Sequence, residues 1–361
     1  MIDEKILKSA EAAAYRLRSL YKSYGYQSFK MSKFEEYDLY VRNKDFLQGN
    51  GVITFSDTGG ELLALKPDVT LSIIKNTTDS DGCISKLYYD ENVYRISGAT
   101  HRFKEIMQTG IECIGDLDSY SLYEVLYLAA KSLSLISESF VLDISHMGVV
   151  KAVIDSLTDD KALASELIKL LSQKNAHEAA ALLSERGVSD ADTEKLVTFI
   201  SIHGKPSEVE KKLEALCDTD EARAALSELS LIGKLLETSE FSDKIRFDFS
   251  VINNMSYYNG IVFKGFIAGI PERVLAGGGY GALMKRMDRK SDAIGFAIYL
   301  DLLEELATSG EYDVDVLLLY DSGESAKKVF SRVSEIRASG KSVTAQTKIP
   351  EKLRYRELVR L

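Results

Sequence analysis

The sequence is poor in the residues that build metal sites and disulfides. Its three cysteines, Cys83, Cys113 and Cys217, lie far apart and form no C-x-x-C pair. The histidines also lack the spacing of a zinc site. We therefore expect no metal, and we expect no cofactor. The four histidines are His101, His146, His177 and His203.

Long apolar runs are also absent from the sequence. No run reaches the roughly 18 apolar residues that a membrane-spanning helix needs. Residues 1–25 are amphipathic and charged, and they lack the apolar core of a signal peptide. The sequence therefore predicts a cytoplasmic protein without a membrane partner.

Basic side chains are fewer than acidic ones. The chain has 45 Lys and Arg against 55 Asp and Glu, which gives a net charge of −10. Proteins that mainly bind polyanions need clustered Lys and Arg, so tRNA is not an expected partner. The 361 residues, 45% hydrophobic and 28% charged, are typical of a globular protein with one main domain and one or two appendages.

The most informative segment is a predicted β-hairpin at Lys86–Gly115. Its arms, Leu87–Arg95 and Ile106–Ile114, alternate between apolar and polar residues, and a polar, glycine-containing break separates them. Alternation at period two is typical of strands, and such a break is typical of a hairpin loop. The loop is cationic at residues 101–104, which would suit a phosphate or an acidic partner.

The second arm of the hairpin points polar side chains to one face. Gln108, Gly110 and Glu112 share that face, because alternate residues of a strand do so. An amide and a carboxylate on one face of an apolar strand indicate a polar pocket, and Gly110 would leave space there for a ligand. The alternative is the solvated edge of an antiparallel sheet.

The segments before the hairpin alternate between helix and strand. Residues 3–24 carry apolar side chains at helical spacing, and Gly25 ends that helix. Residues 26–40 predict a strand and a short helix, and residues 53–70 predict another hairpin. Asp68 is a candidate ligand contact, but its place just before a predicted helix is equally typical of a helix cap.

The segments after the hairpin divide the chain into domains. Residues 158–241 predict an all-helical insertion of four or five short helices. Residues 293–306 predict a strand that leads into a helix. Residues 310–361 predict a β-α-β unit followed by a short terminal helix. Strand-rich segments on both sides of a helical block predict an α+β core built from residues 1–157 and 242–309.

Two motifs resemble those of class II aminoacyl-tRNA synthetases. The hairpin with MQTGIECIG resembles motif 2 of histidyl-tRNA synthetases, and LALKPDVT resembles their LRPE-x-T segment. Residues 26–40 have the form of the dimerising motif 1, although Ser32 replaces its proline. The resemblance implies an antiparallel sheet flanked by helices, with residues 310–361 similar to the start of an anticodon-binding domain.

The resemblance also implies a binding site for histidine or a similar molecule. A carboxylate and an amide suit an ammonium group, and a second carboxylate with a phenol suits an imidazole. Arg95 would correspond to the arginine of motif 2. The residues that match the histidine-binding positions of the family are Asp68, Thr70, Gln108, Glu112, Tyr257, Tyr258 and Tyr280.

Two arginines of the family are missing from this sequence. Asn253 stands where the RGLDYY-like segment has an arginine, and Asp301 and Leu302 replace the Glu-Arg pair of motif 3. Such cations stabilise the charge that develops during adenylation, and losing one typically lowers the rate about a hundred- to a thousandfold. We therefore predict that adenylation and tRNA charging are lost and that the chain has no catalytic residues.

A lost nucleotide site beside a retained amino-acid site resembles the family of ATP phosphoribosyltransferase regulatory subunits. MSYYNGIVFKGF, LDISHMG and the helical insertion are similar to that family. The resemblance implies a non-catalytic subunit that a short catalytic subunit requires for activity. It also implies homodimers within a hetero-octamer, and feedback by histidine in the first step of histidine biosynthesis. The alternatives are a histidyl-tRNA synthetase and another synthetase-like paralogue.

Overall fold

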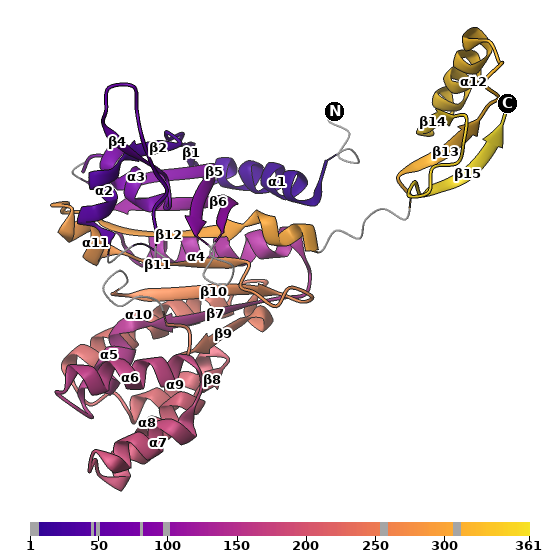
Figure 1. Cartoon of the computed structure of the whole chain (residues 1–361). Coiled ribbons are helices and arrows are strands. Elements are labelled where there is room, and N and C mark those ends of the chain that lie inside the picture. Colours follow the sequence, from indigo (N-terminus) through magenta and orange to yellow (C-terminus); the bar gives the residue numbers. More distant parts are fainter. Residues whose placement is uncertain are drawn as a thin grey trace. The chain divides into compact units, whose positions relative to one another are not determined.

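The computed structural model divides into two compact units, Met1–Glu304 and Glu305–Leu361 (Figure 1). Among the residues that the structure describes, no helix is both long and apolar enough to cross a membrane. The described residues are 7–44, 47, 51–79, 82–96, 102–252, 259–305 and 312–361.

The first unit is built on a nine-stranded mixed sheet, in the order β1-β5-β6-β12-β11-β10-β7-β9-β8. The strands from β5 to β7 pair antiparallel, whereas the β1–β5 and β7–β9 pairs are parallel. The predicted antiparallel core is therefore confirmed, with parallel pairs added toward its edges. The strands are β1 (Gln27–Ser28), β5 (Ser85–Ile96), β6 (Phe103–Gly115), β12 (Asp292–Tyr299), β11 (Leu275–Gly279), β10 (Ile261–Ile267), β7 (Phe140–His146), β9 (Ile245–Asp248) and β8 (His203–Gly204).

The predicted hairpin is the β5–β6 pair, in which Tyr89 lies opposite Gly110. On its other side β6 pairs with β12, so that Gly110 also lies opposite Ala297. The alternative prediction of a solvated sheet edge is therefore wrong. Gln108 and Glu112 are 3% and 2% exposed, because β6 is an interior strand that is covered on both faces.

Two helices cover one face of this sheet. Helix α1 (Ser9–Ser23) and helix α4 (Ser119–Ile136) pack against each other and against the central strands. Helix α1 buries Ala10, Ala13, Leu17 and Tyr21 at the predicted helical spacing. The Tyr21 hydroxyl lies 3.1 Å from the Ser132 hydroxyl of α4, which joins the two helices by a buried hydrogen bond.

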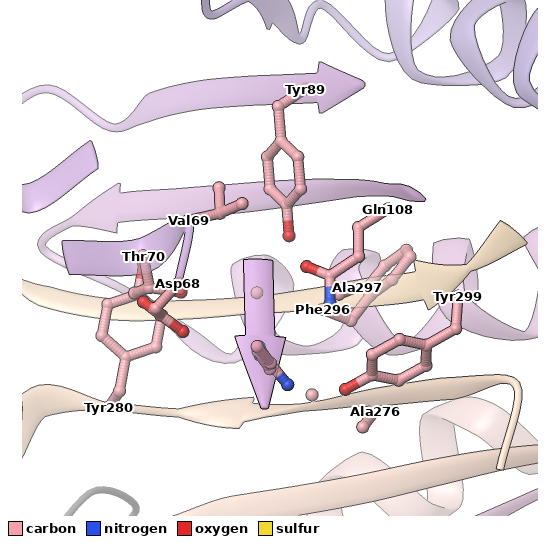
Figure 2. A pocket seen from close by; sticks show the side chains of 13 residues that line it. Asp68, Val69, Thr70, Tyr89, Gln108, Ala276, Tyr280, Phe296, Ala297 and Tyr299 are labelled. Atoms are coloured by element: carbon pink, nitrogen blue, oxygen red, sulfur yellow. The ribbon is translucent and has the colours of Figure 1, made fainter. Parts of the chain in front are cut away.

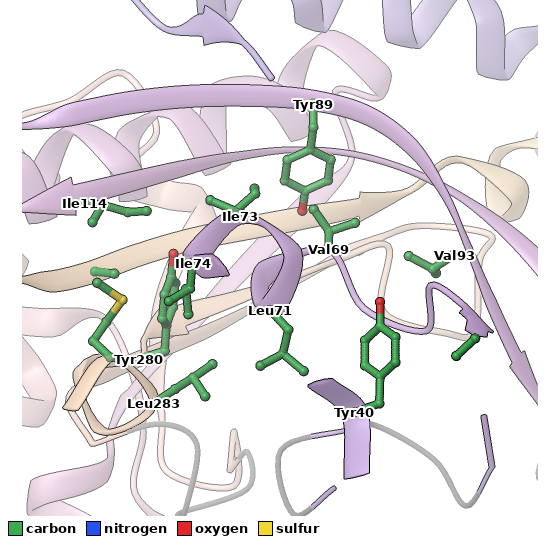
Figure 3. Close-up of a cluster of buried hydrophobic side chains, with 13 residues drawn as sticks. Tyr40, Val69, Leu71, Ile73, Ile74, Tyr89, Val93, Ile114, Tyr280 and Leu283 are labelled. Atoms are coloured by element: carbon green, nitrogen blue, oxygen red, sulfur yellow. The ribbon is translucent and has the colours of Figure 1, made fainter. Parts of the chain in front are cut away.

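The opposite face of the sheet carries a second group of elements and the candidate site. Helix α3 (Thr70–Asn76) and helix α11 (Gly281–Arg286) contribute to a buried apolar cluster there (Figure 3). The chain before α3 forms a separate three-stranded sheet in the order β2-β4-β3. Its strands and the neighbouring helix are β2 (Phe34–Glu36), β3 (Thr54–Ser56), β4 (Leu62–Leu65) and α2 (Tyr37–Arg42). The cluster includes Tyr40, Val69, Leu71, Ile73, Ile74, Tyr89, Val93, Ile114, Tyr280, Leu283 and Met284.

Residues 158–241 form helices that are joined to the main sheet. The short strand β8 lies between two of these helices and pairs with β9, where His203 lies opposite Asp248. The segment is therefore not all helical. Lys174 also reaches β9, with its ammonium 2.6 Å from the Asp248 carboxylate. The helices of this segment are α6 (Lys161–Ser172), α7 (Ala176–Glu185), α8 (Asp190–Ser201), α9 (Pro206–Glu214) and α10 (Asp220–Glu237). Helix α5 (Met147–Asp155) precedes the segment, and the 3-10 helix η3 (Ser242–Lys244) follows it.

Two predictions concern helices near the end of the chain. The helix predicted after β12 is present as a 3-10 helix, η4 (Leu300–Glu305). The predicted terminal helix is wrong. The final segment is a strand, β15 (Tyr355–Arg360), because Val359 and Leu361 lie two residues apart and both pack on the apolar cluster of the second unit. That unit also contains β13 (Val314–Leu319), α12 (Ala326–Ala338) and β14 (Val343–Gln346), and its three strands are parallel.

Candidate functional site

A narrow pocket of about 40 Å³ lies on the sheet face opposite α1 and α4 (Figure 2). Strands β5, β6, β11 and β12 and the start of α3 supply its walls. Five of the predicted ligand residues line it: Asp68, Thr70, Arg95, Gln108 and Tyr280. The other lining residues are Val69, Tyr89, Ala276, Gly277, Gly295, Phe296, Ala297 and Tyr299.

Glu112 lies behind this lining and is held by two hydroxyl groups. The Tyr280 hydroxyl donates to one carboxyl oxygen at 2.7 Å, and the Thr70 hydroxyl donates to the other at 3.1 Å. Burial raises the pKa of Glu112 to about 8, although both hydrogen bonds act in the opposite direction. The surroundings of the carboxyl group therefore favour its protonated form.

Gly295 of β12 makes room for that carboxyl group. A Cβ atom at position 295 would collide with Glu112 Oε2 and with the Ile111 carbonyl oxygen. The absence of a side chain at Gly295 thus lets the carboxyl group lie flat against the next strand.

Asp68 makes a capping contact and also lines the pocket, and the predicted contact with a ligand stays a prediction. One carboxyl oxygen accepts a hydrogen bond of 3.0 Å from the Leu71 backbone at the start of α3, which is a capping contact. The same side chain lines the pocket. Burial raises the pKa of Asp68, and the nearby Arg95 guanidinium partly offsets this effect.

Three polar side-chain ends in the pocket have no hydrogen-bond partner among the described residues. The Gln108 amide and the hydroxyls of Tyr89 and Tyr299 make no hydrogen bond to any described residue. Gln108 and Tyr89 are only 3% and 2% exposed. Buried polar groups normally have partners, so these three ends indicate where a polar ligand would be held.

Sequence reasoning did not identify Tyr89 and Tyr299 as pocket residues, and it wrongly predicted free space for a ligand above Gly110. An ideal Cβ at Gly110 would lie 2.6 Å from the Tyr89 hydroxyl, so the Tyr89 ring fills the space above Gly110. The prediction that this space is open for a ligand is wrong. The hairpin register could have revealed Tyr89, since an aromatic residue opposite glycine in a paired strand packs over it.

A wider cavity of about 350 Å³ adjoins the narrow pocket, and Arg95 and Tyr299 line both. Arg95 Nε donates to the Pro67 carbonyl oxygen at 2.8 Å, which fixes the guanidinium between the two spaces. The other residues that line the wider cavity are Lys104, Ile106, Glu272, Arg273, Asp301 and Leu302.

The predicted replacements of motif 3 lie in this wider cavity. Lys104 forms an ion pair of 2.8 Å with Asp301, so its charge is partly neutralised. Leu302 presents an apolar side chain in the same cavity. The predicted site residues Tyr257 and Tyr258, and the replacement Asn253, lie outside the described residues.

The lining offers hydrogen-bonding groups to a small polar molecule. The narrow end of the site holds two buried carboxyl groups, an amide and phenol hydroxyls, and its wide end is more cationic. Within the described ranges, no group of three His, Cys, Asp or Glu residues could hold a metal ion.

Comparison with known proteins identifies the family. The sequence model of the family described as histidyl-tRNA synthetase matches residues 2–303. The chain belongs to this family. A curated ATP phosphoribosyltransferase regulatory subunit from Oceanobacillus iheyensis is 28% identical over 313 residues, which cover 85% of this chain and 76% of that protein.

Solved structures have the same fold as this family member. A protein from Bacillus halodurans, described as an ATP phosphoribosyltransferase regulatory subunit/histidyl-tRNA synthetase, has a TM-score of 0.77 at 24% identity and covers 100% of this chain and 96% of its own. A chain of an ATP phosphoribosyl transferase complex from Thermotoga maritima has a TM-score of 0.63 at 18% identity and covers 83% of this chain and 97% of its own. The predicted class II synthetase-like α+β fold is confirmed.

Proposed function

We propose that this protein is the regulatory subunit of an ATP phosphoribosyltransferase. It has no chemistry of its own, and a short catalytic subunit requires it for activity and for feedback by histidine in the first step of histidine biosynthesis. The observation that carries the proposal is the similarity to the Oceanobacillus iheyensis regulatory subunit over most of both chains.

The nucleotide side of the site supports a role without catalysis. Adenylation needs cations that meet the charge developing on the phosphates. In this chain Asp301 pairs with Lys104, and Leu302 occupies the position where the family has a motif 3 arginine. The Asp301 carboxylate, which pairs with Lys104, and the apolar Leu302 side chain leave fewer cationic groups in this cavity for a polyanionic leaving group.

The amino-acid side of the site supports histidine as the effector. Asp68 and Gln108 would contact the ammonium group, and Glu112 with Tyr280 would contact the imidazole. Because Glu112 has a pKa of about 8, its neutral carboxyl group can donate a hydrogen bond to an unprotonated imidazole nitrogen.

The surface of the small sheet supports a homodimer as the building block of the assembly. Phe34 and Phe55 lie on one face of the β2-β4-β3 sheet, are 47% and 38% exposed, and contact each other edge to face. Leu63 and Leu65 lie on the same face. A second copy of the chain would cover this apolar face, and four such chains with four catalytic chains would form the hetero-octamer.

Reconstitution with the catalytic subunit from the same genome tests the proposal. The two purified proteins, mixed at micromolar concentration, should form a larger complex on a sizing column. Phosphoribosyl transfer should rise with added regulatory chain until the sites are saturated, and histidine should inhibit the complex. Failure of the two proteins to associate would refute the assignment.

The second candidate is a working histidyl-tRNA synthetase, because the family model that matches the chain carries that name. The two candidates predict opposite results for pyrophosphate exchange. A synthetase catalyses histidine-dependent exchange of pyrophosphate into ATP without any partner, and a regulatory subunit does not.

A further inference from the structure

The two ends of the cleft differ in charge. The narrow pocket holds the Asp68 carboxyl group. The wider cavity holds Lys104 and Arg273 together with Glu272 and Asp301, and Arg95 lines both spaces. A free amino acid has the same polarity, with a cationic ammonium and an anionic carboxylate on one carbon. If its ammonium lies beside Asp68, its carboxylate needs a cation farther along the cleft.

Two of the three cations are already engaged. Arg95 donates to the Pro67 carbonyl, and its charge acts on Asp68. Lys104 is paired with Asp301 at 2.8 Å. Arg273, in contrast, has neither a hydrogen bond nor an ion pair with any described residue, and Glu272 beside it on the rim forms no ion pair with it.

A second cation, Lys264, lies on the sheet face that lines the narrow pocket. Lys264 on β10 is opposite Ala276 on β11, and Ala276 is opposite Ala297 on β12. Ala276 and Ala297 line the narrow pocket, and directly opposed residues share a sheet face. The Lys264 ammonium donates to the Ile252 carbonyl oxygen at 3.1 Å.

The charge of Arg273 acts on Lys264. Burial, followed by repulsion from Arg273, lowers the pKa of Lys264 to about 8, although Asp248 and Asp143 act in the opposite direction. Two neighbouring cations, one of which has no ion-pair partner among the described residues, form an arrangement that an incoming anion would stabilise.

We propose that Arg273, backed by Lys264, binds the carboxylate of the amino acid that occupies this cleft. The inference rests on the proposed function, since it takes histidine as the ligand. It adds the subsite that distinguishes an amino acid from its amine or alcohol analogues. Guanidinium and carboxylate can form two parallel hydrogen bonds, which gives this contact its specificity.

Histidinol provides a direct test, because it keeps the imidazole and the ammonium of histidine and lacks the carboxylate. Calorimetry on the full-length chain would measure the dissociation constants of both ligands for wild type, Arg273→Gln and Arg337→Gln. Arg337 is an exposed arginine of α12, so its variant removes the same charge outside the cleft. We expect Arg273→Gln to raise the dissociation constant of histidine about fivefold to tenfold and to change that of histidinol by less than about twofold. Arg337→Gln should change neither dissociation constant.

A proton measurement gives a second readout. A carboxylate beside Arg273 and Lys264 should raise the pKa of Lys264, so histidine binding at pH 8 should take up protons in wild type. The uptake, measured as the dependence of the binding enthalpy on buffer ionisation, should be smaller in Lys264→Met than in wild type, while the contribution of Glu112, whose pKa is also about 8, remains in both.

Three results would overturn the subsite. Equal weakening of histidine and histidinol by Arg273→Gln would assign Arg273 a structural effect only. Loss of inorganic pyrophosphate binding in this variant, with histidine unchanged, would show that the anion is a phosphate. Wild type that binds neither histidine nor histidinol would remove the effector pocket and this subsite together, while leaving the reconstitution test of the regulatory role unaffected.

Discussion

Tyr280 donates a hydrogen bond of 2.7 Å to Glu112, a residue 168 positions earlier in the chain. The two side chains come from opposite sides of the helical insertion, and they meet because β6 and the β11–α11 junction lie on the same sheet. This contact closes the deep end of the pocket and holds a buried carboxyl group in a fixed position. Several measurable properties of the protein depend on it.

The stability of the protein should depend on pH through Glu112. Its folded pKa of about 8 lies above its ordinary value of 4.5, so the folded state retains a proton that the unfolded state has released. The stability of wild type relative to Glu112→Gln should therefore fall as the pH rises from about 4.5 to about 8. Above about pH 8 the stability difference should stay constant. Melting temperatures of both proteins across this range check the prediction. A constant difference would show that Glu112 ionises normally.

Histidine binding should depend on Glu112. Glu112→Ala removes the group that faces the imidazole in the proposed complex and should weaken histidine at least tenfold, since leaving a buried polar partner unsatisfied costs about 1–3 kcal/mol. Calorimetric titration of wild type and variant measures the change, and the exposed Glu178→Ala serves as control. An unchanged dissociation constant in Glu112→Ala would place the effector site elsewhere and leave the regulatory role standing.

Gly295→Ala should destabilise the fold. The added methyl group would collide with Glu112 Oε2 and the Ile111 carbonyl oxygen, and such overpacking costs about 1–3 kcal/mol. Gly323→Ala is the matched control, because a Cβ atom there meets nothing within 4 Å. Urea unfolding of the two variants should show a lower midpoint for Gly295→Ala only. Equal midpoints would mean that Glu112 can move aside freely.

Phe34→Asp should prevent homodimer formation. It places a charge in the exposed apolar face that Phe34 and Phe55 share, and burying an unpaired charge in an interface is strongly unfavourable. Light scattering at micromolar concentration should give a dimer for wild type and a monomer for the variant. Phe330→Asp in α12, where the side chain is 72% exposed, should remain a dimer. A dimeric Phe34→Asp protein would exclude this face as the interface.

The purified chain should not form histidyl-adenylate. Asp301 pairs with Lys104, and Leu302 replaces a cation in the cavity where charge would develop. We expect no histidine-dependent pyrophosphate exchange above background, in assays where a working histidyl-tRNA synthetase gives a clear signal. Exchange at a comparable rate would favour the synthetase alternative.

Local patterns in the sequence were sufficient to predict the helices and strands that pack through one face. The spacing of Ala10, Ala13, Leu17 and Tyr21 predicts α1, and the alternation of the hairpin arms predicts β5 and β6. The terminal strand β15 was missed because its apolar residues, Val359 and Leu361, are few, and only their packing in the second unit makes them informative.

The sequence by itself determined the family, the hairpin and five of the residues that line the pocket, because these depend on residue type and on spacing along the chain. Only the tertiary structure decided that β6 is an interior strand, that Tyr89 fills the space above Gly110, and that Asp301 neutralises Lys104. Those properties depend on which strands become neighbours across the sheet. Burial on both faces then sets the environment that raises the pKa of Glu112, and no local pattern in the chain specifies that environment.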